Sequence, residues 1–161
     1  MAKKKKDPGV SSGIKIVSVN KTGRRDYEVI DTFEAGISLK GSEVKSVREG
    51  AVNLKESYIR VIREEIFLIG CHISPYSHAP VDAHEPTRER KLLLHKREIE
   101  KLVGLVEQKG LTLFPLKMYF KNGKAKMEIA LGKGKKHYDK REDVKKREAD
   151  REIERAFKIK R

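Results

Sequence analysis

The sequence predicts a mainly β fold with helices: an OB-like closed antiparallel β-barrel of about six strands with two or three helices, followed by a C-terminal tail. Three observations support this prediction. Short segments alternate apolar and polar residues with the period of two that strands require. Gly36 and Gly41 lie within or beside one such segment, where glycine permits the sharp bend of a small barrel. The last 29 residues hold 20 charged side chains and cannot form a core of their own.

The first half of the predicted barrel contains four strands and a short helix. The pattern begins at residue 14 with "IKIVSV" and continues as a long second strand in "DYEVIDTFEAGISL". The stretch "SEVKSVREG" predicts a short helix that begins at Ser42, a favourable N-cap residue, and ends at Gly50. Two further strands are expected in "SYIRVIREEIFLIGCHI", with "REE" as the turn between them.

The second half predicts helices followed by a hairpin. In "TRERKLLLHKREIEKLVGLVEQKG" apolar residues recur at helical spacing between positions 99 and 106, and Gly110 ends the pattern. His95 with Glu98 resembles a capping pair, so we expect two helices that break near His95. The stretch "LTLFPLKMYFKNGKAKMEIAL" predicts a hairpin whose turn is Asn122-Gly123.

We divide the chain into a flexible basic arm (residues 1–13), an RNA-binding barrel (residues 14–132) and a basic C-terminal tail (residues 133–161). The tail holds 13 basic and 7 acidic side chains, which is +6 of the chain's net charge of +14. A chain with this net positive charge is expected to bind a polyanion. The longest apolar runs have about five residues, so we expect no membrane partner. The single cysteine, Cys71, allows no internal disulfide and favours a cytoplasmic location.

One loop offers an alternative function as a metal site. The stretch "HISPYSHAPVDAHE" contains five potential ligands: His72, His78, Asp82, His84 and Glu85. Their spacing matches no compact ligand pattern, and prolines interrupt the loop. A metal-dependent nuclease built on this loop is therefore the weaker alternative.

Other catalytic patterns are missing from the sequence. It contains no P-loop, nucleophile elbow or glycine-rich dinucleotide loop. Glu34 and Glu43 have no acid–base partner at a recognisable spacing. We therefore expect a binding protein and not an enzyme, with no metal, no cofactor and no small-molecule substrate.

Two basic segments of the barrel are candidates for phosphate contacts. The stretch "NKTGRRDY" forms a predicted loop that carries Asn20, Lys21, Arg24 and Arg25, although a solvated basic turn would look the same. In "RKLLLHK", Arg90 and Lys91 precede three leucines that would sweep about 200° of a helix surface. A helix lying on a barrel buries a narrower stripe. Either one leucine faces a partner, or the helix is packed on two sides.

Glu34, in "FEAG", allows two interpretations. It is either a solvated strand residue or a carboxylate on an RNA-binding face. In the second case it would accept hydrogen bonds from base amino groups or 2′-hydroxyls and contribute selectivity.

The tail has the composition of a segment that folds on a partner. Opposite charges recur at helical spacing, in Glu142 with Lys146, Asp143 with Arg147, and Glu154 with Lys158. Each pair contributes only about 0.2–0.5 kcal/mol to a helix. The apolar stripe is thin and consists of Ala149, Ile153, Ala156 and Phe157. We predict that the tail is disordered when free and helical when docked, with His137 and Tyr138 able to stack on bases. A plain solvated end is the alternative.

Several long motifs, in this order along the chain, resemble one family. They are "TFEAGISLKGSEVKSVREG", "NLKESYIRV", "GCHISPY", "TRERKLLLHKREIEKL", "LTLFPLKMYFKNGKAKMEIAL" and "GKGKKHYDKRE". From about residue 14 to residue 155 the chain resembles the SmpB family of SsrA-binding proteins. The resemblance implies a bacterial cytoplasmic protein with an OB-type barrel. It also implies binding to the tRNA-like domain of transfer-messenger RNA (tmRNA) and entry with it into stalled ribosomes for trans-translation. Elongation factor Tu and alanyl-tRNA synthetase would be indirect partners, through the RNA.

The resemblance also implies roles for individual residues. Asn20 with Lys21, Glu34 and Leu93 match the family's RNA-binding face. The part of the tail matching the decoding-centre segment is Lys135, Lys136, His137, Tyr138, Asp139, Lys140 and Arg141, and the helix beyond, with Ile153 and Phe157, matches the segment in the empty mRNA channel. Arg25 stands where the family usually has histidine, and Gly23 where it commonly has alanine. A general OB-fold RNA chaperone or ribosomal protein is the remaining alternative within RNA binding.

Overall fold

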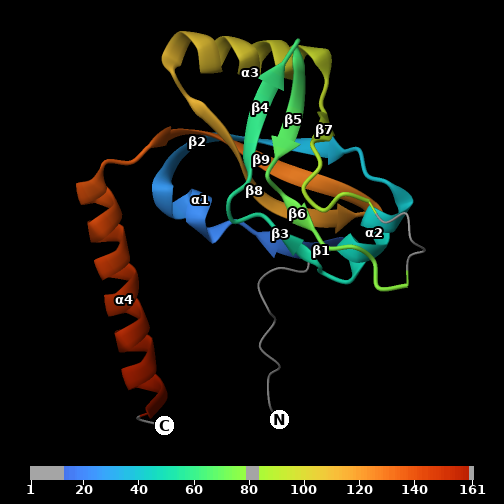
Figure 1. Cartoon of the computed structure of the whole chain (residues 1–161). Coiled ribbons are helices and arrows are strands. Elements are labelled where there is room, and N and C mark those ends of the chain that lie inside the picture. The colour runs from blue at the N-terminus through green and yellow to red at the C-terminus, as the bar shows by residue number, and fades with distance from the viewer. Residues whose placement is uncertain (1–12, 79–83, 160–161) are drawn as a thin grey trace.

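The computed structural model describes residues 13–78 and 84–159; the predicted N-terminal arm lies outside them except for Gly13. Figure 1 shows a strongly twisted sheet with short helices around it and one long helix that stands apart. The elements in chain order are β1 (Ile14–Val19), α1 (Lys21–Asp26), β2 (Tyr27–Ile37), α2 (Gly41–Arg48), β3 (Val52–Asn53), β4 (Tyr58–Ile62), β5 (Glu65–Ile69), β6 (His72–Ile73), β7 (Arg90–Leu93), α3 (Lys96–Lys109), β8 (Thr112–Lys121), β9 (Lys124–Gly134) and α4 (His137–Ile159).

Seven strands form one antiparallel sheet in the order β1-β8-β9-β2-β7-β5-β4, and β3 pairs separately with β6. The mainly β class is confirmed. The predicted closure is not found, because no backbone ladder joins β1 to β4 in the described ranges. Instead β4 lies against β8 across a gap in the hydrogen bonding. The described strands and helices also outnumber those predicted. Strand β3 was not predicted, β6 was not separated from β5, β7 was expected to be helical, and α1 was expected to be a loop.

The β8–β9 hairpin was predicted correctly. Asn122 and Gly123 both have positive φ, at 51° and 74°, as a two-residue hairpin turn requires. The partner register runs from Lys121↔Lys124 down to Thr112↔Gly132, with one bulge. Strand β9 continues to Gly134, two residues beyond the predicted boundary at residue 132, because its end pairs with Tyr27 on β2.

The core lies between the inner face of the sheet and helices α2 and α3. Met118, Met127 and Ile129 contribute from the sheet, and Leu102 is the fully buried residue of α3. Helix α3 crosses the end of the β4–β5 hairpin (Figure 1). It begins after His95, whose backbone N–H donates to the Glu98 carboxylate at 3.0 Å, so the predicted capping pair is present.

The segment before His95 is a strand and not the predicted helix. Strand β7 pairs with β2 on one side and with β5 on the other. Its side chains alternate, with Arg90 and Leu92 buried and Leu93 half exposed. Arginine, lysine and leucine favour helices locally, but pairing on both edges overrides that preference. The exposure of Leu93 therefore follows from strand alternation and not from a crowded helix.

The start of α2 also differs from the prediction. The helix begins at Gly41, one residue before the predicted cap. The Ser42 hydroxyl instead makes a 2.9 Å hydrogen bond with Nδ1 of His84. Nε2 of His84 lies 3.0 Å from the backbone oxygen of Ile73. His84 thus ties α2 to β6 and is buried between them.

A buried ion pair links α2 to β7. Glu43 and Arg90 are both fully buried, and Nε of Arg90 donates to Oε1 of Glu43 at 2.9 Å. Arg88 donates to the same carboxylate at 2.8 and 2.5 Å. Burial raises the pKa of Glu43, but the bonds from Arg88, Lys40 N–H and Arg90 outweigh it, so the pKa lies below its ordinary range. This network fixes the position of β7 and of the leucines on it.

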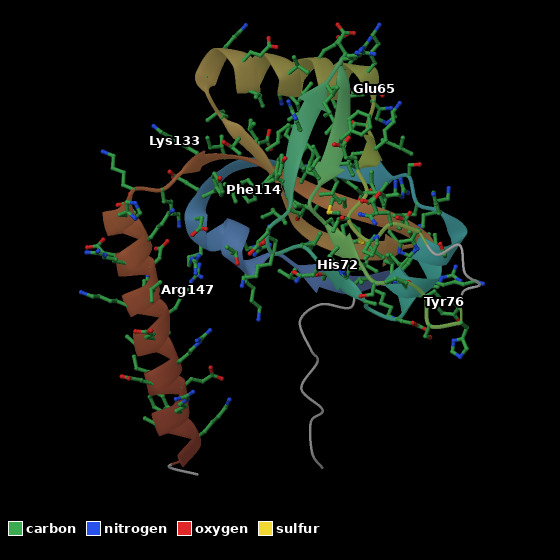
Figure 2. All side chains as sticks on the ribbon, viewed as in Figure 1. Glu65, His72, Tyr76, Phe114, Lys133 and Arg147 are labelled. Atoms are coloured by element: carbon green, nitrogen blue, oxygen red, sulfur yellow. The ribbon has the colours of Figure 1, made fainter. Side chains whose placement is uncertain are left out.

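Helix α4 projects away from the sheet (Figure 1). Its side chains radiate on all sides and are almost all exposed (Figure 2). In the part of the chain that the structure describes, no helix combines the length and apolar character needed to span a bilayer.

Candidate nucleic-acid interface

The outward side of five neighbouring strands forms a continuous surface. One cross-strand row runs Ile16, Tyr119, Lys126, Gly36, Leu93, through β1, β8, β9, β2 and β7. A parallel row runs Val19, Lys117, Glu128, Glu34. We call this surface the outer face and define it by these two rows together with Lys121. Exposed apolar residues lie at its two ends, and charged residues lie between them.

Glu34 lies at the centre of a polar cluster on the outer face. The hydroxyl of Tyr119 donates to Oε2 of Glu34 at 2.5 Å, and Nζ of Lys121 lies 3.2 Å from both carboxylate oxygens. The Tyr119 bond is the main reason that the pKa of Glu34 lies below its ordinary range, with Lys121 and Lys126 adding to it. Glu34 is therefore ionised at neutral pH and can only accept hydrogen bonds. Because 39% of its side chain is exposed, it can also bind an outside donor.

Leu93 lies flat over a glycine. Gly36 is its cross-strand partner, and a Cβ at position 36 would come within 3.2 Å of Cβ of Leu93. The side chain is 52% exposed and borders a hollow that Lys124 and Lys126 also line. An apolar side chain among lysines suits the face of a base or ribose next to a phosphate backbone.

The first basic segment forms helix α1, not a loop. Lys21, Arg24 and Arg25 are exposed on it, as phosphate contacts would require. Asn20, predicted to bind RNA, is only 3% exposed. Its side chain accepts from the N–H of Gly23 at 2.9 Å and donates to the backbone oxygen of Pro115 at 3.0 Å. Asn20 therefore caps α1 and attaches it to β8, and we expect any effect of this residue on RNA binding to act through the position of α1.

Gly23, which stands where the resemblance leads us to expect alanine, is closely packed in this structure. A Cβ there would lie 2.9 Å from both the Asn20 amide and the Phe114 ring. Phe114 lies between α1 and the sheet (Figure 2) and stacks on Tyr27 with ring centroids 4.9 Å apart. The departure at Gly23 therefore goes with a close approach of α1 to β8 in this chain.

Two cations beside the leucines were predicted to contact phosphates, and one of them does not lie on the surface. Arg90 points into the core and is bound by Glu43 and by three backbone oxygens. It cannot contact a phosphate while the fold is intact, because β7 turns its side chain inward. Lys91 points outward and forms a 2.5 Å ion pair with Glu65. Leu93 and Glu34, by contrast, lie on the same side of β2 and β7.

The tail begins next to α1. The N–H of Lys135 donates to the backbone oxygen of Asp26 at 2.9 Å, and Nζ of Lys140 lies 3.9 Å from the Asp26 carboxylate. Lys135 also forms an ion pair with Asp143, which keeps the pKa of that carboxyl low. A cleft lined by Arg25, Lys140, Arg141 and Lys145 separates α1 from α4. The basic surface of α1 thus continues onto the first turns of the tail.

The structure agrees with some of the predicted contacts of the tail and differs from others. Lys158 and Glu154 form the predicted pair at 2.9 Å, whereas Asp143 pairs with Lys135 and not with Arg147. Ile153 and Phe157 are 55% and 72% exposed, so the apolar stripe of α4 is uncovered. The side chains predicted to reach the decoding centre are exposed at Lys136, His137, Asp139 and Arg141. The side chain of Tyr138 lies outside what the structure describes.

The alternative metal site is not assembled among the described residues. His84 is buried and used by Ser42 and Ile73, whereas His72, His78 and Glu85 are exposed. Asp82 lies outside the described ranges. No group of three potential ligands comes together in residues 13–78 and 84–159.

Sequence reasoning missed the partners of Glu34. Tyr119 and Lys121 are 85 and 87 positions away in the chain, and only the β2–β9–β8 register brings them together. The sequence did contain a signal for part of this polar cluster. If β8 and β9 form a hairpin, Tyr119 and Lys121 share one face of it with Lys124 and Lys126.

The comparisons with known proteins agree on one family. The model described as "SmpB protein" matches residues 17–159. The SsrA-binding protein of Persephonella marina is 55% identical over 146 residues, covering 91% of this chain and 96% of the relative. That of Syntrophobacter fumaroxidans is 52% identical over 157 residues, covering 98% of each.

A solved structure supports the same relationship. A chain from the work described as "tmRNA-SmpB: a journey to the center of the bacterial ribosome" is 47% identical, with a TM-score of 0.63. The match covers 79% of this chain and 93% of the other. Sequence and fold thus agree over most of the length, and this chain belongs to the SmpB family.

Proposed function

We propose that this protein is an adaptor that binds the tRNA-like domain of tmRNA and delivers it to stalled ribosomes for trans-translation. The observation that carries the proposal is the outer face, where Glu34 and Leu93, the family's RNA-binding positions, lie on adjacent strands among lysines. The names of the relatives, SsrA-binding protein, and the tmRNA-SmpB structure support the same partner.

Charged groups and the shape of the surface contribute to RNA recognition in different ways. Lys21, Arg24 and Arg25 on α1 supply cations for phosphates, which contribute affinity for any RNA. Glu34 accepts hydrogen bonds from base amino groups or 2′-hydroxyls, and it repels a phosphate placed there. Leu93 offers an apolar surface for an unstacked base or a ribose. Together these contacts favour a folded RNA that presents loops over a plain duplex.

The tail supplies the second part of the function. Lys135, Lys136, His137, Tyr138, Asp139, Lys140 and Arg141 would occupy the decoding centre, and the rest of α4 the empty mRNA channel. A helix of 23 residues extends about 35 Å, which suits a channel. No step of this work requires bond chemistry by the protein, so we assign it no catalytic role and place it in the cytoplasm with the ribosome. An OB-type topology for the curved sheet belongs to the same proposal.

Binding measurements test the proposal directly. We expect the protein to bind the isolated tRNA-like domain at least about tenfold more tightly than an RNA duplex of equal charge, a difference of roughly 1.4 kcal/mol or more. Glu34→Ala and Leu93→Asp should each remove most of this preference. Matched controls are Glu56→Ala and Tyr58→Asp, which change an exposed carboxylate and an exposed apolar residue away from the outer face.

Equal affinity of the unaltered protein for both RNAs would favour the general RNA chaperone instead. Full preference in folded Glu34→Ala and Leu93→Asp would show that the outer face is not the recognition surface. Circular dichroism and thermal unfolding of each variant separate these results from loss of the fold.

A further inference from the structure

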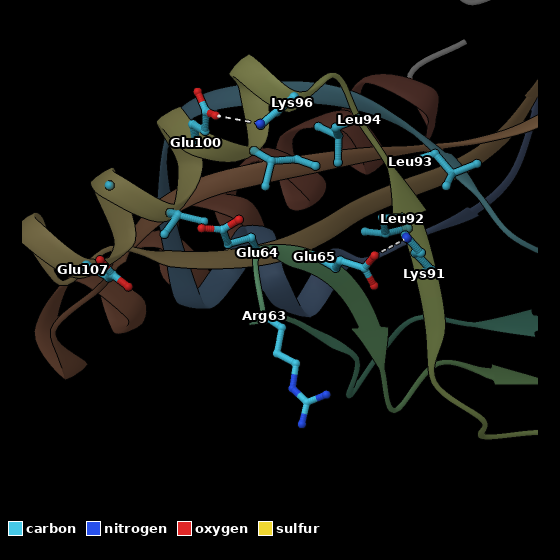
Figure 3. Close-up of a pocket in the computed structure, with 13 residues that line it drawn as sticks. Arg63, Glu64, Glu65, Lys91, Leu92, Leu93, Leu94, Lys96, Glu100 and Glu107 are labelled. Carbon is cyan, nitrogen blue, oxygen red and sulfur yellow. Dashed lines mark hydrogen bonds and ion pairs between the residues drawn. The ribbon is translucent and has the colours of Figure 1, made fainter.

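A groove of about 690 Å³ lies between α3, the end of β7 and the β4–β5 turn (Figure 3). Leu92, Leu94, Ile99 and Val103 give it an apolar lining. The groove is separate from the α1 surface and from the tail, and it meets the outer face only at Leu93.

The charge balance of this groove is opposite to that of the rest of the chain. Of its cations, Lys91 pairs with Glu65 at 2.5 Å and Lys96 with Glu100 at 4.0 Å, while the Arg63 side chain points away (Figure 3). Glu64 and Glu107 remain, and neither has an ion pair or side-chain hydrogen bond within the described structure. Two uncompensated carboxylates beside an apolar surface disfavour a phosphate backbone and favour a cationic ligand.

Gly104 gives a second, independent observation. It lies inside α3, where glycine costs a helix roughly 0.5–1 kcal/mol relative to alanine. No packing contact explains it, because a Cβ at this position would have no neighbour within 4 Å. It also lines the groove, so its missing side chain leaves room for another backbone to approach α3 closely.

We propose that this groove docks a basic, apolar peptide segment of a partner protein. Its apolar side chains would contact Leu94, Ile99 and Val103, and its lysines or arginines would pair with Glu64 and Glu107. The peptide backbone would cross α3 at Gly104. The chain's own basic arm fits less well, because residues 1–13 have four lysines but few apolar side chains. Because the groove adjoins Leu93, a bound partner would lie beside RNA held on the outer face.

A synthetic peptide of alternating lysine and leucine tests the proposal with the full-length protein. Titration followed by backbone NMR should shift resonances of α3, β7 and the β4–β5 turn. We expect about tenfold weaker binding by a glutamate–leucine peptide of equal length, which lacks the cations, and by oligolysine, which lacks the apolar side chains. Glu64→Gln combined with Glu107→Gln should weaken binding of the lysine–leucine peptide several-fold and reduce its salt dependence.

Gly104 provides a matched pair of variants. Gly104→Phe fills the groove and should lower affinity for the lysine–leucine peptide about tenfold or more. Gly104→Ala adds one methyl group in open space and should change it less than about twofold. Alanine raises helix propensity, so this control also tests folding. Binding of RNA by both variants should match the unaltered protein.

Three results would overturn the proposal. The first is equal peptide binding by Gly104→Phe and the unaltered protein, or shifts that map elsewhere. The second is self-association in sedimentation that Gly104→Phe abolishes, which would make a second copy of the chain the occupant. The third is several-fold tighter peptide binding after deletion of residues 1–12, which would make the chain's own arm the occupant.

Discussion

The hydroxyl of Tyr119 on β8 donates a 2.5 Å hydrogen bond to Glu34 on β2, across the intervening strand β9. Tyr119 itself is 5% exposed, and Nζ of Lys117 lies over its ring at 5.6 Å. Burial and the neighbouring carboxylate both raise the pKa of Tyr119, so its proton stays in place at neutral pH. Tyr119 thus holds the Glu34 carboxylate in a fixed orientation on the outer face.

Removing this bond should weaken RNA recognition without harming the fold. We expect Tyr119→Phe to lower affinity for the tRNA-like domain by about two- to tenfold, the range for one hydrogen bond. The slope of log K against log salt should stay the same, because Tyr119 neutralises no phosphate. Tyr27→Phe is the matched control, since it removes a hydroxyl but keeps the stack on Phe114. Unchanged affinity in Tyr119→Phe would mean that Glu34 needs no positioning.

The cations of α1 should contribute to RNA affinity through their charge and not to the preference for the tRNA-like domain. Arg24→Gln is expected to reduce the salt slope by roughly 0.7–0.9 and to weaken binding to the tRNA-like domain and to duplex RNA alike. Filter binding over a range of salt concentrations measures both quantities. A change in preference between the two RNAs with no change in slope would show that Arg24 reads bases and not phosphates.

The buried Glu43–Arg90 pair gives a prediction for stability. Because the folded-state pKa of Glu43 lies below its ordinary value of 4.5, its bonds stabilise the fold above that pH. This contribution is lost as the pH falls through the folded-state pKa. Glu43→Gln should lower the free energy of unfolding at pH 7 by roughly 3–5 kcal/mol, because it leaves Arg90 buried without its partner.

Urea unfolding of both proteins between pH 7 and pH 3 checks this prediction. The gap in unfolding free energy between the unaltered protein and Glu43→Gln should narrow as the pH falls. Glu65→Gln, which breaks a half-exposed pair, should cost no more than about 1 kcal/mol. A gap that stays constant with pH would contradict the role given to the Glu43 charge.

The tail should be only locally stable in the free protein. Its contacts with the rest of the described chain lie at its start, where the N–H of Lys135 donates to the backbone oxygen of Asp26 and Lys140 pairs with the Asp26 carboxylate, while Ile153 and Phe157 are uncovered. We expect amides of residues 145–159 to exchange within seconds in free protein and to be protected on the ribosome. Exchange as slow as that of β8 and β9 in the free state would contradict this expectation.

Local sequence patterns correctly predicted the elements that depend on the backbone preferences of neighbouring residues. The Asn122-Gly123 hairpin, the capping pair at His95 and Glu98, and the break at Gly110 each follow from backbone preferences within a few residues. Residues 90–93 were predicted wrongly because their strand exists only through β2 and β5, which lie far away in sequence. The inward turn of Arg90 follows from the same pairing.

The same limit applied to the candidate site, where contacts between distant strands could not be predicted from local patterns. Glu34 and Leu93 were identified by resemblance, and the sheet brings both to one surface. Their partners Tyr119 and Gly36 depend on strand register, which periodicity alone does not fix. Asn20 was predicted to contact RNA because it lies in a basic segment and matches a family position, but its side-chain oxygen accepts from the N–H of Gly23 and caps α1.

Peptide tagging on ribosomes stalled at the end of an mRNA tests the central claim, that the outer face binds RNA and the tail engages the ribosome. The decisive variant ends after Gly134, where β9 ends, and is compared with the full chain in tagging and in binding to the tRNA-like domain. We predict affinity within about threefold of the full chain, because the outer face is intact, and no detectable tagging. Normal tagging by the shortened protein would contradict the account of the tail, and loss of RNA binding would contradict the separation of the two surfaces.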